Sequence, residues 1–284
     1  MISRLSDLGK IVKQALAEDL VRNDVTTRLL FPKSIQAEAT IQVKQEAILA
    51  GLPVAEAVFK KVDPRLKFKS LARDGDRVKA GAIVARLEGD GRSLLKGERV
   101  ALNFLQHLSG IATLTARFVE AIRGTKATIL DTRKTTPGLR NLEKYAVRMG
   151  GGRNHRMSLS DGILIKDNHL ALAESLKTAV GRARKRAPRR CKVEVETTHL
   201  KEIEAALLAK ADIILLDNMT IPQLKEAVRF INGRALTEAS GGVHLNHVRE
   251  IAETGVDFIS IGALTHSAPA VDMSMDIIPL KRTR

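Results

Sequence analysis

Residues 131–170 combine many cations with short apolar segments of the kind that form buried strands. The stretch reads DTRKTTPGLRNLEKYAVRMGGGRNHRMSLSDGILIKDNHL and holds eight Lys or Arg residues, two His and a Gly-Gly-Gly run. A guanidinium such as that of Arg133 or Arg156 can bind a carboxylate or a phosphate through two parallel hydrogen bonds. These residue types therefore indicate a site for anionic molecules.

The whole chain is also basic, and three classes of anionic partner compete to explain this. Its 284 residues carry a formal net charge of +15, which suits nucleic acid, an anionic membrane surface or anionic small substrates. Single-strand platforms stack bases on aromatic side chains, whereas this chain has no Trp, one Tyr and seven Phe. Small anionic substrates are favoured, and a nucleic-acid-binding protein with salt-sensitive affinity stays the alternative.

Cysteine usage and hydropathy exclude several other classes. The single Cys191 excludes a disulfide framework within the chain and a Cys-rich zinc site. The N-terminus MISRLSDLGKIVKQAL has no apolar core of a signal peptide, and no apolar run approaches membrane-spanning length. We expect a cytoplasmic protein with no membrane partner.

The first part of the chain mixes helical and strand patterns, which predicts an α+β domain over residues 1–112. The predicted helices are 6–20, one beginning near Pro53, and 93–124 with a break near Gly110. The predicted strands are 37–51, 66–72 and 82–89.

Residues 113–284 change to short apolar runs that alternate with helical runs. The predicted strands are 127–131, 162–166, 192–196, 212–217, 235–239 and 257–262, with a weaker one at 273–278, and the helices between them are 138–149, 171–187, 199–210, 221–231 and 244–254. This alternation indicates βα units and a parallel sheet. We predict an α/β fold with an incomplete (open) TIM-like barrel, and an open doubly wound sheet is the alternative.

Most of these strands end in polar or glycine-rich groups. In parallel barrels the chemistry lies at the carboxyl ends of the strands, although loops are polar in any case. The groups include Asp131 to Lys134, Lys166 to His169, Glu194 and Glu196, Asp217 and Asn218, and Glu238. Lys166 is the clearest case because it ends the apolar run GILIK, where an unpaired charge is costly. A salt bridge to an acid of a neighbouring strand is the structural alternative.

Two glycine-containing loops follow the last clear strands. They are Ser240-Gly241-Gly242 and Ile261-Gly262-Ala263, where backbone N–H groups can approach a phosphate closely; two ordinary tight turns are the alternative. Glu196 and Asp217 cannot bind anions, and they fit sugar hydroxyls or a divalent metal shared with phosphates. The basic run 181–190 is instead expected at a solvated helix C-terminus, opposite the catalytic loops.

The segments carrying these residues resemble the quinolinate phosphoribosyltransferase family. The resemblance rests on GERVALNFLQHLSGIAT, DTRKTTPGLRNLEKYAVRMGGGRNHR, SDGILIKDNH, VEVET, ILLDN, EASGGV and ISIGALTHS. It implies an N-terminal α/β domain, a C-terminal incomplete barrel and a homodimer or larger homo-oligomer. The implied reaction joins quinolinate to phosphoribosyl pyrophosphate and gives nicotinate mononucleotide, pyrophosphate and CO₂ in de novo NAD biosynthesis.

The resemblance also implies roles for individual residues. Arg99 would reach the quinolinate in the site of the partner subunit, and Arg133, His155 and Arg156 would hold the two carboxylates. Lys134 and Lys166 would contact both substrates, while Glu196 and Asp217 would bind ribose hydroxyls and Mg²⁺, directly or indirectly. No organic cofactor is implied. The remaining implied substrate-binding residues are Thr132, Ser240, Gly241, Gly242, Ile261, Gly262, Ala263 and His266.

Two other enzyme classes compete with this interpretation. A barrel aldolase or lyase would use Lys166 as a Schiff base, which borohydride would trap. A relative with another phosphoribosyl acceptor, or a paralogue linked to metal transport, would share most of the motifs.

Overall fold

The computed structural model describes residues 7–19, 24–188 and 191–280. The chain forms two compact units. The first comprises Met1–Ala116, Thr136–Gly151 and Thr265–Arg284, and the second comprises Arg117–Thr135 and Gly152–Leu264. In the described part, no helix has the length and apolar character needed to span a bilayer.

The first unit is built on a four-stranded antiparallel sheet with the order β12-β1-β5-β3. Its strands are β1 (Gln36–Val43), β3 (Lys67–Ser70), β5 (Ile83–Asp90) and β12 (Met273–Pro279). The predicted strand 37–51 is thus interrupted, because β1 ends at Val43 and only Ala47–Ile48 continues as β2, paired with β4 (Arg77–Val78).

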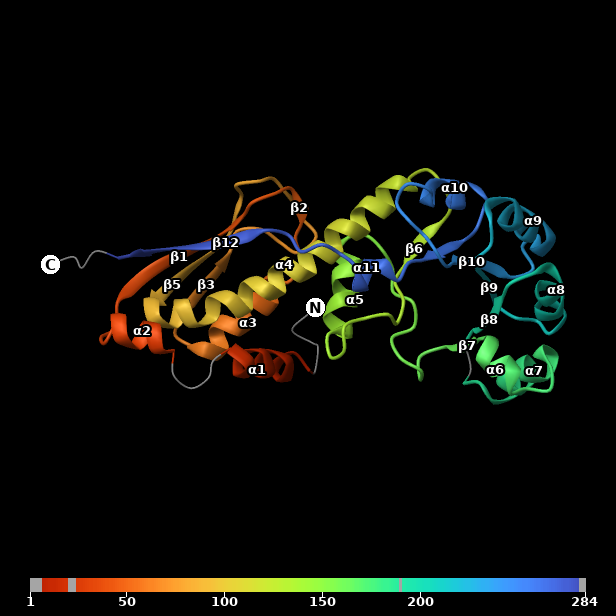
Figure 1. Cartoon of the computed structure of the whole chain (residues 1–284), viewed down its shortest axis with the longest axis horizontal. Helices are drawn as coiled ribbons and strands as arrows, with labels where there is room; N and C mark the ends of the chain where they lie inside the picture. Colours follow the sequence, from red (N-terminus) through yellow and green to blue (C-terminus); the bar gives the residue numbers. More distant parts are fainter. Residues whose placement is uncertain (1–6, 20–23, 189–190, 281–284) are drawn as a thin grey trace. The chain divides into compact units, whose positions relative to one another are not determined.

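Strand β12 corrects the prediction that 273–278 is a weak strand of the barrel. It pairs antiparallel with β1 along its whole length, from Ala37 opposite Pro279 to Val43 opposite Met273. Figure 1 shows the blue C-terminal strand beside β1, in the sheet of the first unit. Pairing with β1 makes β12 an edge strand of this sheet.

The helices of the first unit are α1 (Leu8–Asp19), α2 (Val25–Leu30), α3 (Leu52–Val62), α5 (Arg140–Met149) and most of α4 (Gly91–Ala121). Helix α4 is continuous, so the predicted break near Gly110 is wrong. Gly110 instead lets the chain at Pro269 approach, because a Cβ at Gly110 would overlap the Pro269 carbonyl oxygen. Close backbone approach explains this mid-helix glycine.

The second unit contains a six-stranded parallel sheet with the order β6-β11-β10-β9-β8-β7. Its strands are β6 (Thr128–Leu130), β7 (Ile163–Ile165), β8 (Val193–Thr197), β9 (Ile213–Asp217), β10 (Leu236–Ser240) and β11 (Phe258–Ser260), and its helices are α6 (Asp167–Ala171), α7 (Leu176–Arg186), α8 (Leu200–Leu208), α9 (Ile221–Ile231) and α10 (Val248–Glu253). The short helix α11 spans Ala263–His266. Figure 1 shows α7, α8 and α9 along the outer side of strands β7 to β9.

The strand order distinguishes the two predicted architectures. Strands β7 to β11 follow one another in sequence order, and β6 lies beside β11. A doubly wound sheet would reverse its order at a switch point, which this sheet does not do. Consecutive strands β6 and β7 instead form the two edges of the sheet. The predicted open TIM-like barrel is therefore confirmed.

Candidate active site

The register of the parallel strands places three of the predicted site residues of the second unit on one face. Glu196 pairs with Leu215, and Asp217 pairs with Ser240. Paired residues of neighbouring strands point to the same side of a sheet, and so do residues two apart in one strand. Glu196, Asp217 and Ser240 therefore share one face near the carboxyl ends of their strands, where barrel chemistry is found.

Lys166 joins this set through an ion pair. Its Nζ lies 2.6 Å from Glu196 Oε2, and the Lys166 side chain is 44% exposed whereas that of Glu196 is only 12% exposed. The salt bridge to a neighbouring strand that the sequence left as an alternative is present. The half-exposed amine stays accessible from the carboxyl end of the sheet, so the pairing does not exclude a catalytic role.

The loop after β10 is shaped around Asn218. The Asn218 amide donates to the Ser240 carbonyl at 2.8 Å, and its side chain donates to Asp217 Oδ2 at 2.7 Å. Gly241 has a φ of +92°, and a Cβ there would overlap the Asn218 side-chain oxygen. Only glycine satisfies both conditions, which leaves an exposed stretch of backbone at Gly241-Gly242.

A short segment after the Gly-rich turn is fixed to strand β6. Arg153 N donates to the Ile129 carbonyl at 2.9 Å, and Asp131 N donates to the Arg153 carbonyl at 3.2 Å. The fully buried Asp131 carboxylate accepts from the His155 backbone N at 2.9 Å and from the Asn154 side chain. These bonds set the direction in which His155 and Arg156 leave the sheet edge.

Arg156 lies partly buried beside a second arginine. Burial lowers the pKa of Arg156 and the like charge of Arg133 lowers it further, whereas Glu194 opposes the shift. Two cations close enough to repel each other in a partly desolvated place would gain from a shared anion. The structure thus brings Arg133 and Arg156 together, as the sequence predicted.

The His155 imidazole bridges Arg156 and two buried acids. Its Nδ1 accepts a hydrogen bond from the Arg156 backbone N at 2.7 Å. Its Nε2 lies 3.0 Å from Glu194 Oε2 and 3.6 Å from Glu238 Oε1. The two acids were noted at strand ends but not assigned to the site. Their spacing, two residues before Glu196 and Ser240, was the available signal, because it puts them on the same face.

The surroundings of Glu238 favour its protonated form. Burial, followed by the Glu194 carboxylate, raises the pKa of Glu238 to about 7, while His155 and Ser260 oppose the rise. Glu194 Oε1 and Glu238 Oε1 are buried and accept from no donor in the described residues. A proton held between the two carboxyl groups satisfies this pair and avoids two adjacent buried negative charges.

The three side chains do not form a metal centre, although their ligand atoms lie within 4.8 Å of one another. A neutral imidazole carries one hydrogen. Because Nδ1 accepts from the Arg156 N–H, the hydrogen is on Nε2, which then has no lone pair for a metal. The His155–Glu194–Glu238 cluster is therefore a proton-linked network.

Comparison with known proteins assigns this arrangement to a family. Residues 24–109 match the family model for the N-terminal domain of quinolinate phosphoribosyl transferase, and residues 111–276 match that for its C-terminal domain. The chain belongs to the quinolinate phosphoribosyltransferase family. The resemblance carried by the sequence motifs is thus confirmed.

Individual relatives of the quinolinate phosphoribosyltransferase family resemble the whole chain. A Synechocystis protein described as a probable nicotinate-nucleotide pyrophosphorylase [carboxylating] is 44% identical over 94% of this chain and 91% of its own length. The chloroplastic enzyme of that name from Arabidopsis thaliana is 43% identical over 95% of this chain and 83% of its own. NadC from Streptococcus pyogenes has a TM-score of 0.93 at 44% identity and covers 97% of this chain and 98% of that one.

Two residues predicted from the family resemblance, Arg99 and His266, do not belong to the second unit. Arg99 is exposed on α4, and His266 is exposed at the end of α11 with its Nδ1 2.6 Å from Ser267 Oγ; both belong to the first unit. Lys134 is exposed, and its backbone N donates to Thr132 Oγ1 at 3.0 Å. The second unit by itself therefore holds all predicted site residues except Arg99 and His266.

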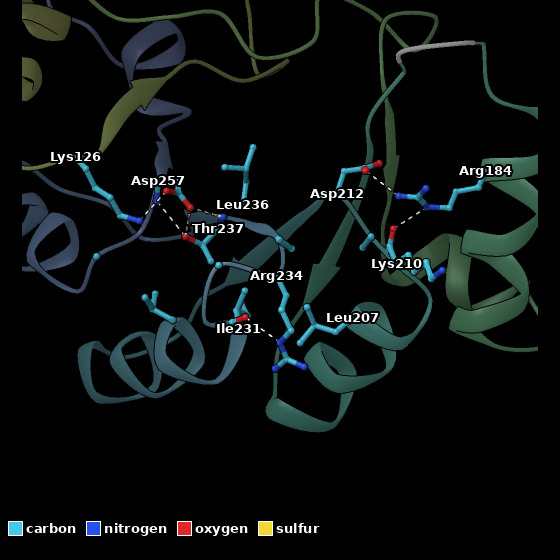
Figure 2. Close-up of a pocket in the computed structure, with 15 residues that line it drawn as sticks. Lys126, Arg184, Leu207, Lys210, Asp212, Ile231, Arg234, Leu236, Thr237 and Asp257 are labelled. Atoms are coloured by element: carbon cyan, nitrogen blue, oxygen red, sulfur yellow. Dashed lines mark hydrogen bonds and ion pairs between the residues drawn. The ribbon is translucent and has the colours of Figure 1, made fainter.

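A basic cavity at the other end of the sheet is not the catalytic site. Figure 2 shows that Arg184 reaches both the Lys210 carbonyl and Asp212, at 2.7 and 2.8 Å. Arg234 donates to the Ile231 carbonyl at the end of α9, and Lys126 pairs with Asp257. The expectation that the basic run closes a helix end is confirmed for Arg184, which lies in the last turn of α7. These cations stabilise helix ends and strand starts.

We expect Glu238→Gln to remove a pH dependence of folding. Because folding raises the pKa of Glu238 to about 7, its contribution to stability is complete below the unfolded pKa and is lost as pH rises through the folded value. The difference in free energy of unfolding between the unmodified protein and Glu238→Gln should therefore change with pH. As the pH rises from about 4.5 to about 7, the unmodified protein should lose up to about 3 kcal/mol relative to the variant.

Urea unfolding across this pH range measures the difference. Leu215→Val, in the strand position paired with Glu238, is the control: it should lower stability without changing its pH slope. Equal slopes for Glu238→Gln and the unmodified protein would show that Glu238 does not hold the proton.

Proposed function

We propose that this chain joins quinolinate to phosphoribosyl pyrophosphate and releases pyrophosphate and CO₂, giving nicotinate mononucleotide for de novo NAD biosynthesis. The family membership and the names of relatives about 44% identical over nearly the whole chain support this activity. The structural observation that carries it is the Arg133–Arg156 pair beside a face of carboxylates and an amine. Such a site suits a dicarboxylate next to a sugar phosphate.

Arg133 and Arg156 hold the two carboxylates of quinolinate in this proposal. Each charge-assisted hydrogen bond contributes about 1.5–3 kcal/mol, and a bound dianion removes the repulsion between the two guanidinium groups. Lys134 follows Arg133 directly in the sequence. Lys166 forms the ion pair with Glu196 on the neighbouring strand. They would contact both the dicarboxylate and the pyrophosphate group of the second substrate, together with Thr132.

The phosphoribosyl half of the site is assigned to the loops after β9, β10 and β11. Backbone N–H groups of Ser240-Gly241-Gly242 and Ile261-Gly262-Ala263 would bind the phosphate. Glu196 and Asp217 would accept hydrogen bonds from the ribose hydroxyls. His266 is proposed to complete the phosphate site.

The residues present also fit a Mg²⁺ ion that accompanies phosphoribosyl pyrophosphate. Mg²⁺ prefers oxygen ligands and usually takes one or two carboxylates together with phosphate oxygens. Glu196 and Asp217 offer carboxylates on adjacent strands of one face. The ion would neutralise charge that develops on the leaving pyrophosphate.

The chemistry needs no nucleophile from the protein. Breaking the bond between C1 of the ribose and pyrophosphate leaves positive charge on the ribose, and the pyridine nitrogen of quinolinate forms the new bond at C1. The positive pyridinium nitrogen stabilises the electron pair left on the adjacent ring carbon as CO₂ leaves, and a proton from water then takes the place of the lost carboxylate. Positioning by the arginines and electrostatic stabilisation by Lys134 and Lys166 would supply most of the rate.

A homodimer or larger homo-oligomer, with Arg99 entering the site of the partner subunit, is part of the proposal. The exposure of Arg99 on α4 is consistent with contact to another subunit. Cytoplasmic location, and the expectation of no nucleic-acid partner and no organic cofactor, stay predictions.

A direct assay tests the activity. Purified protein with quinolinate, phosphoribosyl pyrophosphate and Mg²⁺ should form nicotinate mononucleotide and CO₂, and chelation of the metal should lower the rate. Nicotinate in place of quinolinate is the control acceptor, because it lacks the second carboxylate. Product from nicotinate but not from quinolinate would contradict the proposed activity. It would indicate an enzyme of this kind that uses another phosphoribosyl acceptor.

Variants of the two halves should change different kinetic constants. We expect Arg156→Ala to raise the KM for quinolinate by about 10- to 100-fold, because one charge-assisted contact is lost. Lys166→Ala should mainly lower kcat, because its charge acts on the leaving group in the transition state. Arg182→Ala, which removes an exposed cation paired with Glu174, is the control. An unchanged quinolinate KM in Arg156→Ala would remove Arg156 from the binding set.

Mixed oligomers test the role of Arg99 across the interface. Arg99→Ala and Lys166→Ala should each lower activity strongly, whereas subunits of both kinds, mixed and reassembled, should regain activity. If each site uses Arg99 of one subunit and Lys166 of the other, random dimers should recover about a quarter of the normal rate. No recovery in verified mixed dimers would place both residues in the site of one subunit.

A further inference from the structure

We propose that Glu194 and Glu238 are positioning residues for the dicarboxylate half of the site. They hold the His155 imidazole with its hydrogen on Nε2, and His155 in turn holds the Arg156 backbone N–H and so fixes where the Arg156 guanidinium enters the site. This inference rests on the proposed function, since it concerns how quinolinate is bound. It adds two buried acids that the sequence motifs left without a role.

The first step is the contact between His155 and Arg156. The Arg156 backbone N donates to His155 Nδ1 at 2.7 Å, so this ring nitrogen must present a lone pair. The His155 backbone is held independently, because its N donates to the fully buried Asp131 at 2.9 Å. With the backbone fixed at His155, the orientation of the imidazole decides the path of the chain at Arg156.

The second step is the contact that orients the imidazole. Nε2 carries the hydrogen and lies 3.0 Å from Glu194 Oε2, with Glu238 Oε1 at 3.6 Å. Glu194 and Glu238 are 4% and 1% exposed, so water does not compete for this bond. A carboxylate acceptor at Nε2 selects one of the two tautomers of a neutral imidazole. The tautomer that results is the one that can accept from Arg156.

The presence of two acids rather than one has a physical reason. Burial and Glu194 favour the protonated form of Glu238, and in that form the cluster of His155 and the two acids carries a single negative charge. That charge lies close enough to Arg156 to favour its charged form. Glu238 acts through Glu194, since a proton between the two carboxyl groups leaves Glu194 Oε2 as the acceptor for His155.

Loss of the acceptor should misplace Arg156. Without Glu194, the tautomer with its hydrogen on Nδ1 becomes available, and this hydrogen would face the Arg156 N–H. Two donors cannot face each other at 2.7 Å, so the segment would shift. A displacement of about 1 Å in a substrate-positioning group can lower the rate by about 10²-fold.

Three variants separate positioning from mere stabilisation. Glu194→Leu should raise the KM for quinolinate about tenfold, with changes below about twofold in the KM for phosphoribosyl pyrophosphate. Glu194→Gln keeps an oxygen that can accept from Nε2 and should return the quinolinate KM to within about threefold of normal. Asp212→Asn removes a carboxylate that accepts from the Val193 N at 2.8 Å at the other end of the same strand. It should lower Tm without changing either KM.

A spectroscopic measurement on the unmodified protein needs no variant to fold. Nitrogen-15 NMR of labelled histidine distinguishes the two tautomers of neutral imidazole from the imidazolium ion, and the His155 signals are identified by their loss in His155→Gln. We expect a neutral ring with its hydrogen on Nε2 at neutral pH. An imidazolium ion, or hydrogen on Nδ1, overturns the proposal, as does an equal rise of both KM values in Glu194→Leu.

The two proposals fail in different ways. If the unmodified protein forms no nicotinate mononucleotide from quinolinate, the proposed function fails, whereas the NMR signature of His155 does not depend on any substrate. If the protein turns over quinolinate but His155 has the wrong tautomer, the function stands and the positioning role of Glu194 and Glu238 falls.

Discussion

The structure of the second unit depends on placing charged groups on the buried face of a parallel sheet. Glu194, Glu196 and Glu238 all point to one side because every second residue of a strand does so. Buried charges are tolerated only when they are paired or neutralised. Glu196 pairs with Lys166, Glu194 contacts His155, and burial favours the protonated form of Glu238. These contacts account for the charged side chains that the strands themselves place on this face.

The two ends of the sheet use their cations differently. At the amino end, Arg184 and Arg234 donate to backbone carbonyls and Lys126 pairs with Asp257, where they complement the negative ends of helices. At the carboxyl end, burial and the like charge of Arg133 lower the pKa of Arg156, whereas Glu194 opposes the shift. Net charge alone therefore does not locate the site in this basic chain. The position of each cation at one or the other end of the strands distinguishes the two groups.

Local patterns predicted the elements well but failed where a distant segment decides. Helix 221–231 has its predicted bounds because a Thr220 capping box with Gln223 begins it and Asn232 ends it in a left-handed conformation. The predictions of a helix break near Gly110 and of a barrel strand at 273–278 were wrong. Gly110 packs against Pro269, and β12 pairs with β1 from the opposite end of the chain. No window of neighbouring residues contains either contact.

The sequence by itself determined the βα alternation, the open barrel class and the residue types at the strand ends, because periodicity and turn residues are local properties. It also contained the spacing of Glu194 and Glu238, although nothing local assigned them a role. Only the tertiary structure decided which ring nitrogen of His155 carries the hydrogen. That choice depends on Arg156, on β8 and on β10 at once, and the protonation of one side chain follows from the groups that folding brings around it.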